Sequence, residues 1–212
     1  MNEKILEIVK KVREAKKRNF KQTFDLAINL KGLDLKKSEN KIKSEITLPH
    51  GLGKAAKIGL IVDMLIPKAK ELENIVLIKK DEVEELGRNK KLAKKFAKEC
   101  KSFVAEAPLM PLVGKFLGQV LAVRNKMPTP IPPTLQDLKP VIQKRLNIVK
   151  IALKDSPVIH LPVGSEEMKD EHIAENIETT INSVTGILPK GRDNIKNFYL
   201  KLTMGKGVKF NL

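Results

Sequence analysis

The sequence predicts two α/β domains: a discontinuous two-layer domain with an antiparallel-type sheet, and a Rossmann-like parallel α/β domain inserted into it. Strand patterns near both ends of the chain alternate apolar and polar residues, which is typical of antiparallel sheets with one solvated face. The middle contains continuous apolar runs between helical patterns, which is typical of a parallel sheet covered on both faces. The expected domains are 1–52 with 147–212, and 53–146. Insertions are tolerated because their two ends can lie close together.

The N-terminal part begins with an amphipathic helix, predicted over residues 3–18 by an apolar stripe at helical spacing. Residues 23–30 alternate strictly and predict a half-buried strand. A polar loop over 31–41 leads to a second strand, 42–48, which ends before Pro49. The His-Gly-Leu-Gly run at 50–53 then marks the change of character.

The pattern of the middle part predicts alternating strands and helices. Apolar runs at 58–62 and 75–78 predict buried strands, with a short helix at 67–72 between them. Then follow a lysine-rich helix over 89–100, a short strand over 103–105 and a glycine-containing helix over 112–121.

Four prolines within 127–133 predict an extended loop before a helix over 135–146. Residues 148–153 and 157–163 predict a hairpin that turns at 154–156. The chain ends with an amphipathic helix over 168–184 and a strand over 198–204.

The charge of the chain is strongly positive, with 41 Lys+Arg against 25 Asp+Glu in 212 residues. Residues 1–52 carry 13 basic and 7 acidic side chains, residues 53–146 carry 19 and 10, and residues 147–212 carry 9 and 8. Such an excess favours binding to a phosphate backbone, because each neutralised phosphate releases counterions. A lysine-rich surface without such a partner is the alternative.

Composition excludes several classes of protein. Aromatic residues make up 4% of the chain, which argues against a single-strand binder whose sheet is paved with rings. One cysteine, Cys100, allows neither an intramolecular disulfide nor a cysteine-built zinc site. No apolar run has the length of a membrane span, and no signal-peptide core is visible, so we expect a cytoplasmic protein without a membrane partner.

No motif supports catalysis. A phosphate-binding loop around Gly53 and Lys54 would need an earlier glycine and a following Ser or Thr, but Leu48 and Ala55 stand there. We therefore interpret Gly51 and Gly53 as a hinge between the domains. The three histidines lack ligand spacing, and no G-x-S-x-G or G-x-G-x-x-G motif occurs, so we expect no metal, no cofactor and no enzyme. A nucleotide-dependent enzyme built on the parallel domain is the alternative hypothesis, and a basic protein–protein adaptor is a third.

Two features suit RNA. Phe20 lies between Arg18 and Lys21 at a helix-to-strand junction, where its ring can press on a ribose or a base; a core position is an equal alternative. Thr203, Met204 and Gly205 end a predicted strand with a hydroxyl, an apolar wedge and room for close approach to a 2′-hydroxyl. An ordinary strand-ending turn is the alternative there.

Four runs together resemble the ribosomal protein L1 family. They are Phe20-Lys-Gln-Thr23, Thr47-Leu-Pro-His-Gly-Leu-Gly-Lys54, Pro157-Val-Ile-His-Leu-Pro-Val-Gly164 and Leu202-Thr-Met-Gly205. The resemblance covers essentially the whole chain in order. The high lysine content and the Met-Pro-Thr-Pro run are similar to archaeal members.

The resemblance implies a structural constituent of the large ribosomal subunit, monomeric when free, that binds the stalk region of ribosomal RNA next to the tRNA exit site. It also implies that the protein assists the exit of deacylated tRNA and represses translation by binding its own mRNA.

The RNA-binding residues that the resemblance implies lie on the discontinuous domain: Phe20, Thr23, Asn197, Thr203, Met204 and Gly205. Asn197 stands where the family often has serine and keeps a polar donor and acceptor, and Lys206 stands where the family often has proline. Because the inserted domain carries the highest net charge, we expect it to act as a second, weaker clamp on neighbouring RNA, since phosphate contacts position while other contacts specify.

Overall fold

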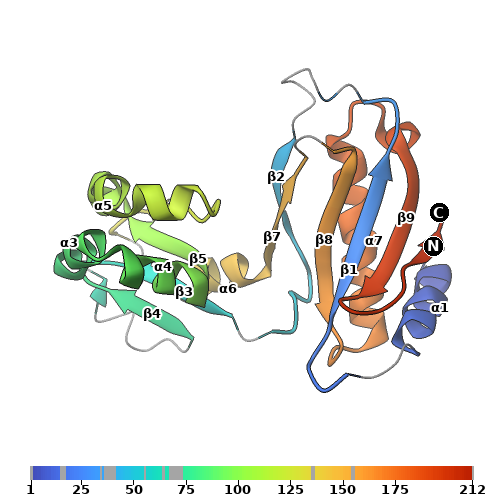
Figure 1. Ribbon diagram of the computed structural model, residues 1–212, viewed down its shortest axis with the longest axis horizontal. Helices are drawn as coiled ribbons and strands as arrows, with labels where there is room; N and C mark the ends of the chain where they lie inside the picture. Colours follow the sequence, from blue (N-terminus) through green and yellow to red (C-terminus); the bar gives the residue numbers. More distant parts are fainter. Residues whose placement is uncertain are drawn as a thin grey trace. The chain divides into compact units, whose positions relative to one another are not determined.

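The computed structural model describes residues 2–14, 18–33, 35, 42–54, 56–63, 65–66, 74–134, 137–153 and 156–211 (Figure 1). The chain divides into two compact units, which we call unit 1 (1–54 and 147–212) and unit 2 (55–146). Unit 1 contains an antiparallel sheet and unit 2 a parallel one, so the predicted fold class is confirmed.

The main sheet of unit 1 has the order β10-β9-β1-β8, and every neighbouring pair in it is antiparallel. Its strands are β1 (Thr23–Leu30), β8 (Val158–Ser165), β9 (Ile195–Leu202) and β10 (Val208–Phe210). Alternate residues of β1 are buried, as the period of two predicts. They pack into one core with helices α1 (Asn2–Arg13) and α7 (Asp170–Ile187).

A second, two-stranded sheet pairs β2 (Lys43–Thr47) with β7 (Ile148–Ala152). The predicted hairpin between 148–153 and 157–163 is therefore wrong, because β8 pairs with β1 instead. Strand β2 leads out of unit 1 and β7 leads back into it, so their pairing brings the two ends of the insertion together. The bond from Leu48 N to Asn147 O, 3.0 Å long, continues this contact past the strand ends.

Unit 2 is built on a parallel sheet with the order β4-β3-β5-β6. Its strands are β3 (Lys57–Ile61), β4 (Ile75–Ile78), β5 (Cys100–Glu106) and β6 (Thr129–Ile131). The sequence predicts only a loop where β6 lies. Extended prolines suit this position because β6 is an edge strand, which pairs with β5 alone.

Helices cover both faces of the unit 2 sheet. On one face α3 (Lys80–Arg88), α4 (Lys90–Glu99) and α5 (Met110–Ala122) enclose a core with Ile61 and Phe103. On the other, α6 (Lys139–Asn147) packs its Ile142 with Ile58 and Leu60. The sequence prediction missed α3, whose buried residues are only Val83 and Leu86 among many charges.

Several predicted bounds shift. The last long strand is β9, which ends at Leu202, so that 203–205 form a turn beyond it, and β10 and the short 3-10 helices 107–109 and 191–194 were not predicted. The predicted helix at 67–72 lies outside the described residues, as do parts of the predicted helix 3–18, the loop 31–41, the start of helix 135–146 and the turn at 154–156.

We expect Gly59→Ala to destabilise unit 2. A Cβ at Gly59 would lie 2.3 Å from Cδ1 of Phe103 on the neighbouring strand β5, and overpacking of this kind costs about 1–3 kcal/mol. Gly114→Ala in α5 is the matched control, since its Cβ meets nothing within 4 Å, and alanine should raise stability by about 0.5–1 kcal/mol. Urea denaturation followed by circular dichroism measures both, and equal effects would contradict the packing argument.

Candidate nucleic-acid interface

The predicted residues Thr23 and Thr203 lie side by side, because β1 begins where its antiparallel neighbour β9 ends. Thr203 N donates to Thr23 O at 3.1 Å, and Thr23 N donates to Thr203 Oγ1, also at 3.1 Å. The Thr203 hydroxyl in turn donates to Thr23 O at 3.3 Å. One hydroxyl thus closes the end of the strand pair while its residue stays exposed.

The next two residues form a tight turn that presents an apolar side chain. Gly205 N donates to Leu202 O at 2.8 Å. A Cβ at Gly205 would lie 3.2 Å from Cβ of Leu202, so a larger residue would crowd the turn. Met204 leaves 60% of its surface exposed, so its apolar side chain is accessible to a ligand at this turn.

Gln22 supports this turn, and the sequence analysis did not single it out as a site residue. Its Oε1 accepts from Met204 N at 3.2 Å, and the residue is only 1% exposed. Its backbone N donates to Glu166 Oε2 at 3.2 Å, and its carbonyl accepts from Glu166 N at 3.0 Å. The sequence held a sign of this role. Gln22 continues the alternation of the buried residues Phe24 and Leu26, so a polar side chain is expected on the core side of the strand.

Phe20 is 52% exposed, which excludes the alternative that it is a core residue. It borders an open hollow lined by Arg18, Asn19, Lys21, Glu166 and Glu167. Lys21 and Glu167 form an exposed ion pair across this hollow at 2.7 Å. The ring is therefore available to a ligand, two residues before Gln22.

Arg13 stabilises the segment 166–170, which lies next to Gln22. Its guanidinium donates to the carbonyls of Glu166 and Met168, both at 2.7 Å, and pairs with Asp170 Oδ1 at 2.7 Å. It also lies over the ring of Phe24, 5.6 Å from the centroid. These bonds tie α1 to the β8–α7 connection, which in turn holds Gln22.

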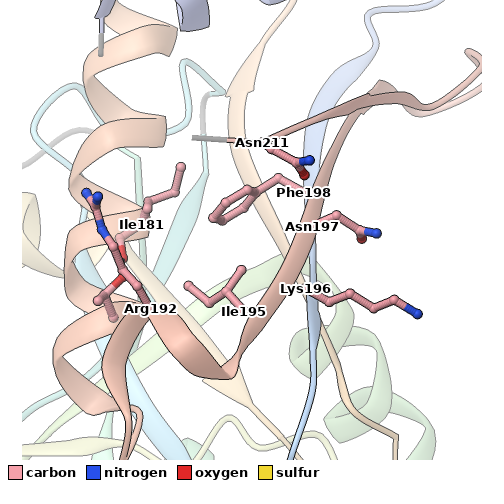
Figure 2. Close-up of a pocket in the computed structure, with 8 residues that line it drawn as sticks. Ile181, Arg192, Ile195, Lys196, Asn197, Phe198 and Asn211 are labelled. Carbon is pink, nitrogen blue, oxygen red and sulfur yellow. The ribbon is translucent and has the colours of Figure 1, made fainter.

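Asn197 lies apart from the other predicted residues. It stands six residues before Thr203, about 20 Å away at the rise of an extended strand. It is 7% exposed, and its Oδ1 accepts from Asn29 Nδ2 at 2.7 Å. Asn197 is among the residues that line the small pocket of Figure 2, but its side chain points away from α7, whereas those of Ile195 and Phe198 point toward that helix. Asn197 therefore joins the site only through a ligand that follows the open face of the sheet.

Charged side chains on that open face surround Asp25. Asp25 lies directly opposite Lys201 on β9, and partial burial raises the pKa of its carboxyl above the ordinary 3.8, against the opposing effects of Lys201, Lys54 and His160. Lys54 Nζ also donates to Thr23 Oγ1. The site thus places two lysines and one poorly solvated carboxylate beside the strand ends.

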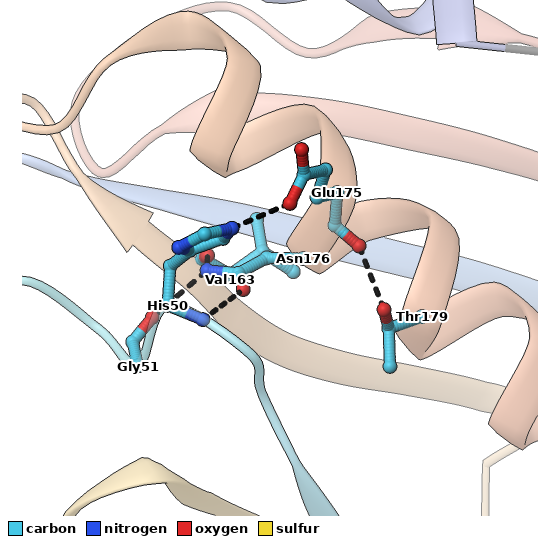
Figure 3. A network of polar contacts seen from close by, with 6 residues as sticks. All are labelled: His50, Gly51, Val163, Glu175, Asn176 and Thr179. Carbon is cyan, nitrogen blue, oxygen red and sulfur yellow. Dashed lines mark hydrogen bonds and ion pairs between the residues drawn. The ribbon is translucent and has the colours of Figure 1, made fainter.

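The first crossing between the units is held by a buried side chain of α7 (Figure 3). Asn176 is 0% exposed; its Nδ2 donates to Gly51 O and to Val163 O, both at 2.8 Å, and its Oδ1 accepts from His50 N at 3.2 Å. The ring of His50 stacks on that of His172, with centroids 4.1 Å apart.

Gly51 and Gly53 both have left-handed backbones, with φ of 61° and 63°. A Cβ at Gly51 would lie 2.5 Å from Asn147 Oδ1, at the other crossing. Glycine is therefore required here by conformation and by close approach. Whether the two glycines also act as a hinge stays a prediction.

Within the described ranges, no cluster of His, Cys, Asp and Glu could hold a metal ion. The same residues include no helix long and apolar enough to cross a bilayer.

Comparison with known proteins identifies the family. The model of the ribosomal protein L1p/L10e family matches residues 12–206. The chain belongs to the ribosomal protein L1 family. Similar relatives include large ribosomal subunit protein uL1 of Pyrococcus abyssi, 47% identical over 98% of this chain and 95% of the relative. Those of Methanothermobacter thermautotrophicus (46%, 99% of each chain) and Thermococcus kodakarensis (44%, 98% and 96%) are also similar.

This membership confirms the expected archaeal ribosomal protein L1. The L1 family consists of structural proteins of the cytoplasmic ribosome that are not enzymes, so the alternative of a nucleotide-dependent enzyme is wrong.

We expect Asn176→Leu to lower the free energy of unfolding by about 3 kcal/mol, because buried carbonyls of Gly51 and Val163 lose their donor. The control is Thr179→Ala, one turn away on an exposed part of α7, where a change within about 0.5 kcal/mol is expected. Denaturant titration measures both, and a small effect at Asn176 would show that the crossing does not need this anchor.

Asp25→Asn should gain stability relative to the wild type as pH rises. The folded-state pKa of Asp25 is raised, so the stability that its protonated form contributes is present below the unfolded pKa and lost as pH rises through the folded one. The asparagine variant has no such loss. Melting temperatures of both proteins from about pH 3 to 7 measure the difference, and a difference that stays constant with pH would contradict the assignment.

Proposed function

We propose that the chain binds the stalk region of large-subunit ribosomal RNA through the surface formed by Phe20, Thr23 and the turn 203–205. Family membership supports ribosomal RNA as the partner. The main support is the structure of the turn 203–205. The apolar side chain of Met204 is exposed there, while its backbone N–H already donates to the buried side chain of Gln22. Such an arrangement is pre-organised and needs little ordering when a ligand binds.

The chemistry of this surface suits structured RNA. RNA is recognised by shape, by stacking and by contacts to 2′-hydroxyls, which can both donate and accept. Phe20 offers an exposed ring and Thr203 a hydroxyl, and Gly205 allows the tight turn that holds Met204 beside them. Lys54 and Lys201 add positive charge for nearby phosphates.

The same surface supports two finer roles. A site that recognises RNA shape will also bind a messenger that folds into the same shape, which is the basis for repression of the protein's own mRNA. Contact with deacylated tRNA at the exit site follows from a position on the stalk. We infer both roles, a monomeric free state, and reorientation of the units at Gly51 and Gly53 from the family resemblance.

A basic protein–protein adaptor is the remaining alternative, which the positive charge alone would also fit. Association that survives nuclease treatment would favour the adaptor, whereas copurification of ribosomal RNA that nuclease abolishes supports the proposal.

Thr203→Val should reduce discrimination between a stalk fragment of the ribosomal RNA and an unrelated RNA duplex. Valine keeps the volume but removes a hydroxyl, and loss of a hydrogen bond to a desolvated RNA group costs about 1–3 kcal/mol. Thr203→Ser keeps the hydroxyl, together with its strand-closing bonds to Thr23, and should retain discrimination, which assigns the effect to the hydroxyl and not to the methyl group. Filter binding measures the affinity ratio. Equal discrimination by the valine variant and the wild type would place recognition elsewhere.

A further inference from the structure

Helix α4 of unit 2 carries a surface of a single charge sign. Its five lysines are all exposed, and at about 100° per residue they fall within one arc of about 140°. Its one carboxylate, Glu99, lies outside this arc and pairs with Lys57 Nζ at 2.8 Å. We call this surface the α4 lysine face; it consists of Lys90, Lys91, Lys94, Lys95 and Lys98.

Folding does not explain the α4 lysine face. Three of its pairs stand four residues apart, where like charges on a helix repel. Lys90 and Lys91 occupy the first turn, where the positive end of the helix dipole disfavours cations. Within the part of the chain that the structure describes, none of the five forms an ion pair. By contrast, the lysines of α1 alternate with Glu3 and Glu7.

We propose that the α4 lysine face docks on the phosphate backbone of double-helical RNA. The inference rests on the proposed function, which already brings the chain to structured RNA, and adds a second contact on the other unit. The face is about 12 Å long. A nucleic-acid duplex carries roughly one phosphate per 1.7 Å of its axis, so it offers a counter-charge for every lysine.

The residues around the face argue for a duplex. No aromatic ring stands within the arc, so the face offers nothing on which an unpaired base could stack. A membrane surface fits less well, because Ala93 and Ala97 of α4 are buried in the core of unit 2 and Leu92 is the one exposed apolar residue of this helix. Lysine ammonium groups act as point charges, so this contact would add affinity without reading sequence.

The test replaces Lys91, Lys94 and Lys98 together with glutamine in the full chain. The matched control replaces Lys4, Lys10 and Lys11 on α1, which makes the same change in net charge on another exposed helix. The probes are an RNA duplex of unrelated sequence and the stalk fragment, each titrated at several salt concentrations. Melting temperatures confirm that both variants fold, and the α4 variant should melt no lower than the wild type because repulsion is relieved.

The α4 variant should bind both RNAs at least tenfold more weakly at low salt, and by the same factor. The slope of log affinity against log salt should fall by about 2–3, since three phosphate contacts are lost. The control should leave the slope within about 0.5 of the wild type. Equal slopes of log affinity against log salt in the two variants would overturn the proposal. The proposal would also be overturned if the α4 variant lost binding to anionic lipid vesicles while its binding to both RNAs stayed unchanged.

Failure of this inference can be told from failure of the proposed function. The α4 contact is read from the salt slope on an unrelated duplex, whereas the recognition site is read from the discrimination that Thr203→Val removes. An unchanged slope with discrimination lost in the valine variant refutes the α4 contact alone. A reduced slope with discrimination intact in that variant supports the α4 contact and refutes the recognition site.

Discussion

The pairing of β1 with both β8 and β9 is the constraint on which unit 1 depends. One central strand from the first thirty residues joins two strands from the last sixty, and its alternate side chains fill the core shared by α1 and α7. The same pairing sets the beginning of β1 beside the end of β9. Thr23 and Thr203 therefore meet although 180 residues separate them, and the candidate interface exists only because the sheet has closed.

The insertion of unit 2 follows from a second pairing. β2 and β7 run side by side, so the chain leaves and re-enters unit 1 at neighbouring points. Asn176 then satisfies three backbone groups around the first crossing from a fully buried position. A buried amide with every such partner in place specifies one arrangement, because any other would leave desolvated polar groups unpaired. Gly51 and Gly53 adopt left-handed backbones at this crossing.

Charge and shape are divided between the two units. Unit 1 carries the exposed Met204 side chain and the Thr203 hydroxyl. The positive charge of Lys54 and Lys201 on this surface is partly offset by the nearby carboxyl group of Asp25. Unit 2 carries α4, with five exposed lysines and a single paired carboxylate. This is the division expected where backbone contacts position a protein on a nucleic acid and local contacts specify the site.

The sequence by itself determined the fold class, the inserted parallel unit and most helices and strands, because periodicity and apolar runs report directly on which faces are buried. Its motifs also marked Phe20, Thr203, Met204 and Gly205, which lie at or beside strand ends. Only the tertiary structure decided that β7 pairs with β2 and not with β8, that Gln22 supports the turn, and that Asn197 stands far from Thr203. Periodicity fixes the face of a strand but not its neighbour, and a polar residue's partner depends on segments distant in the chain.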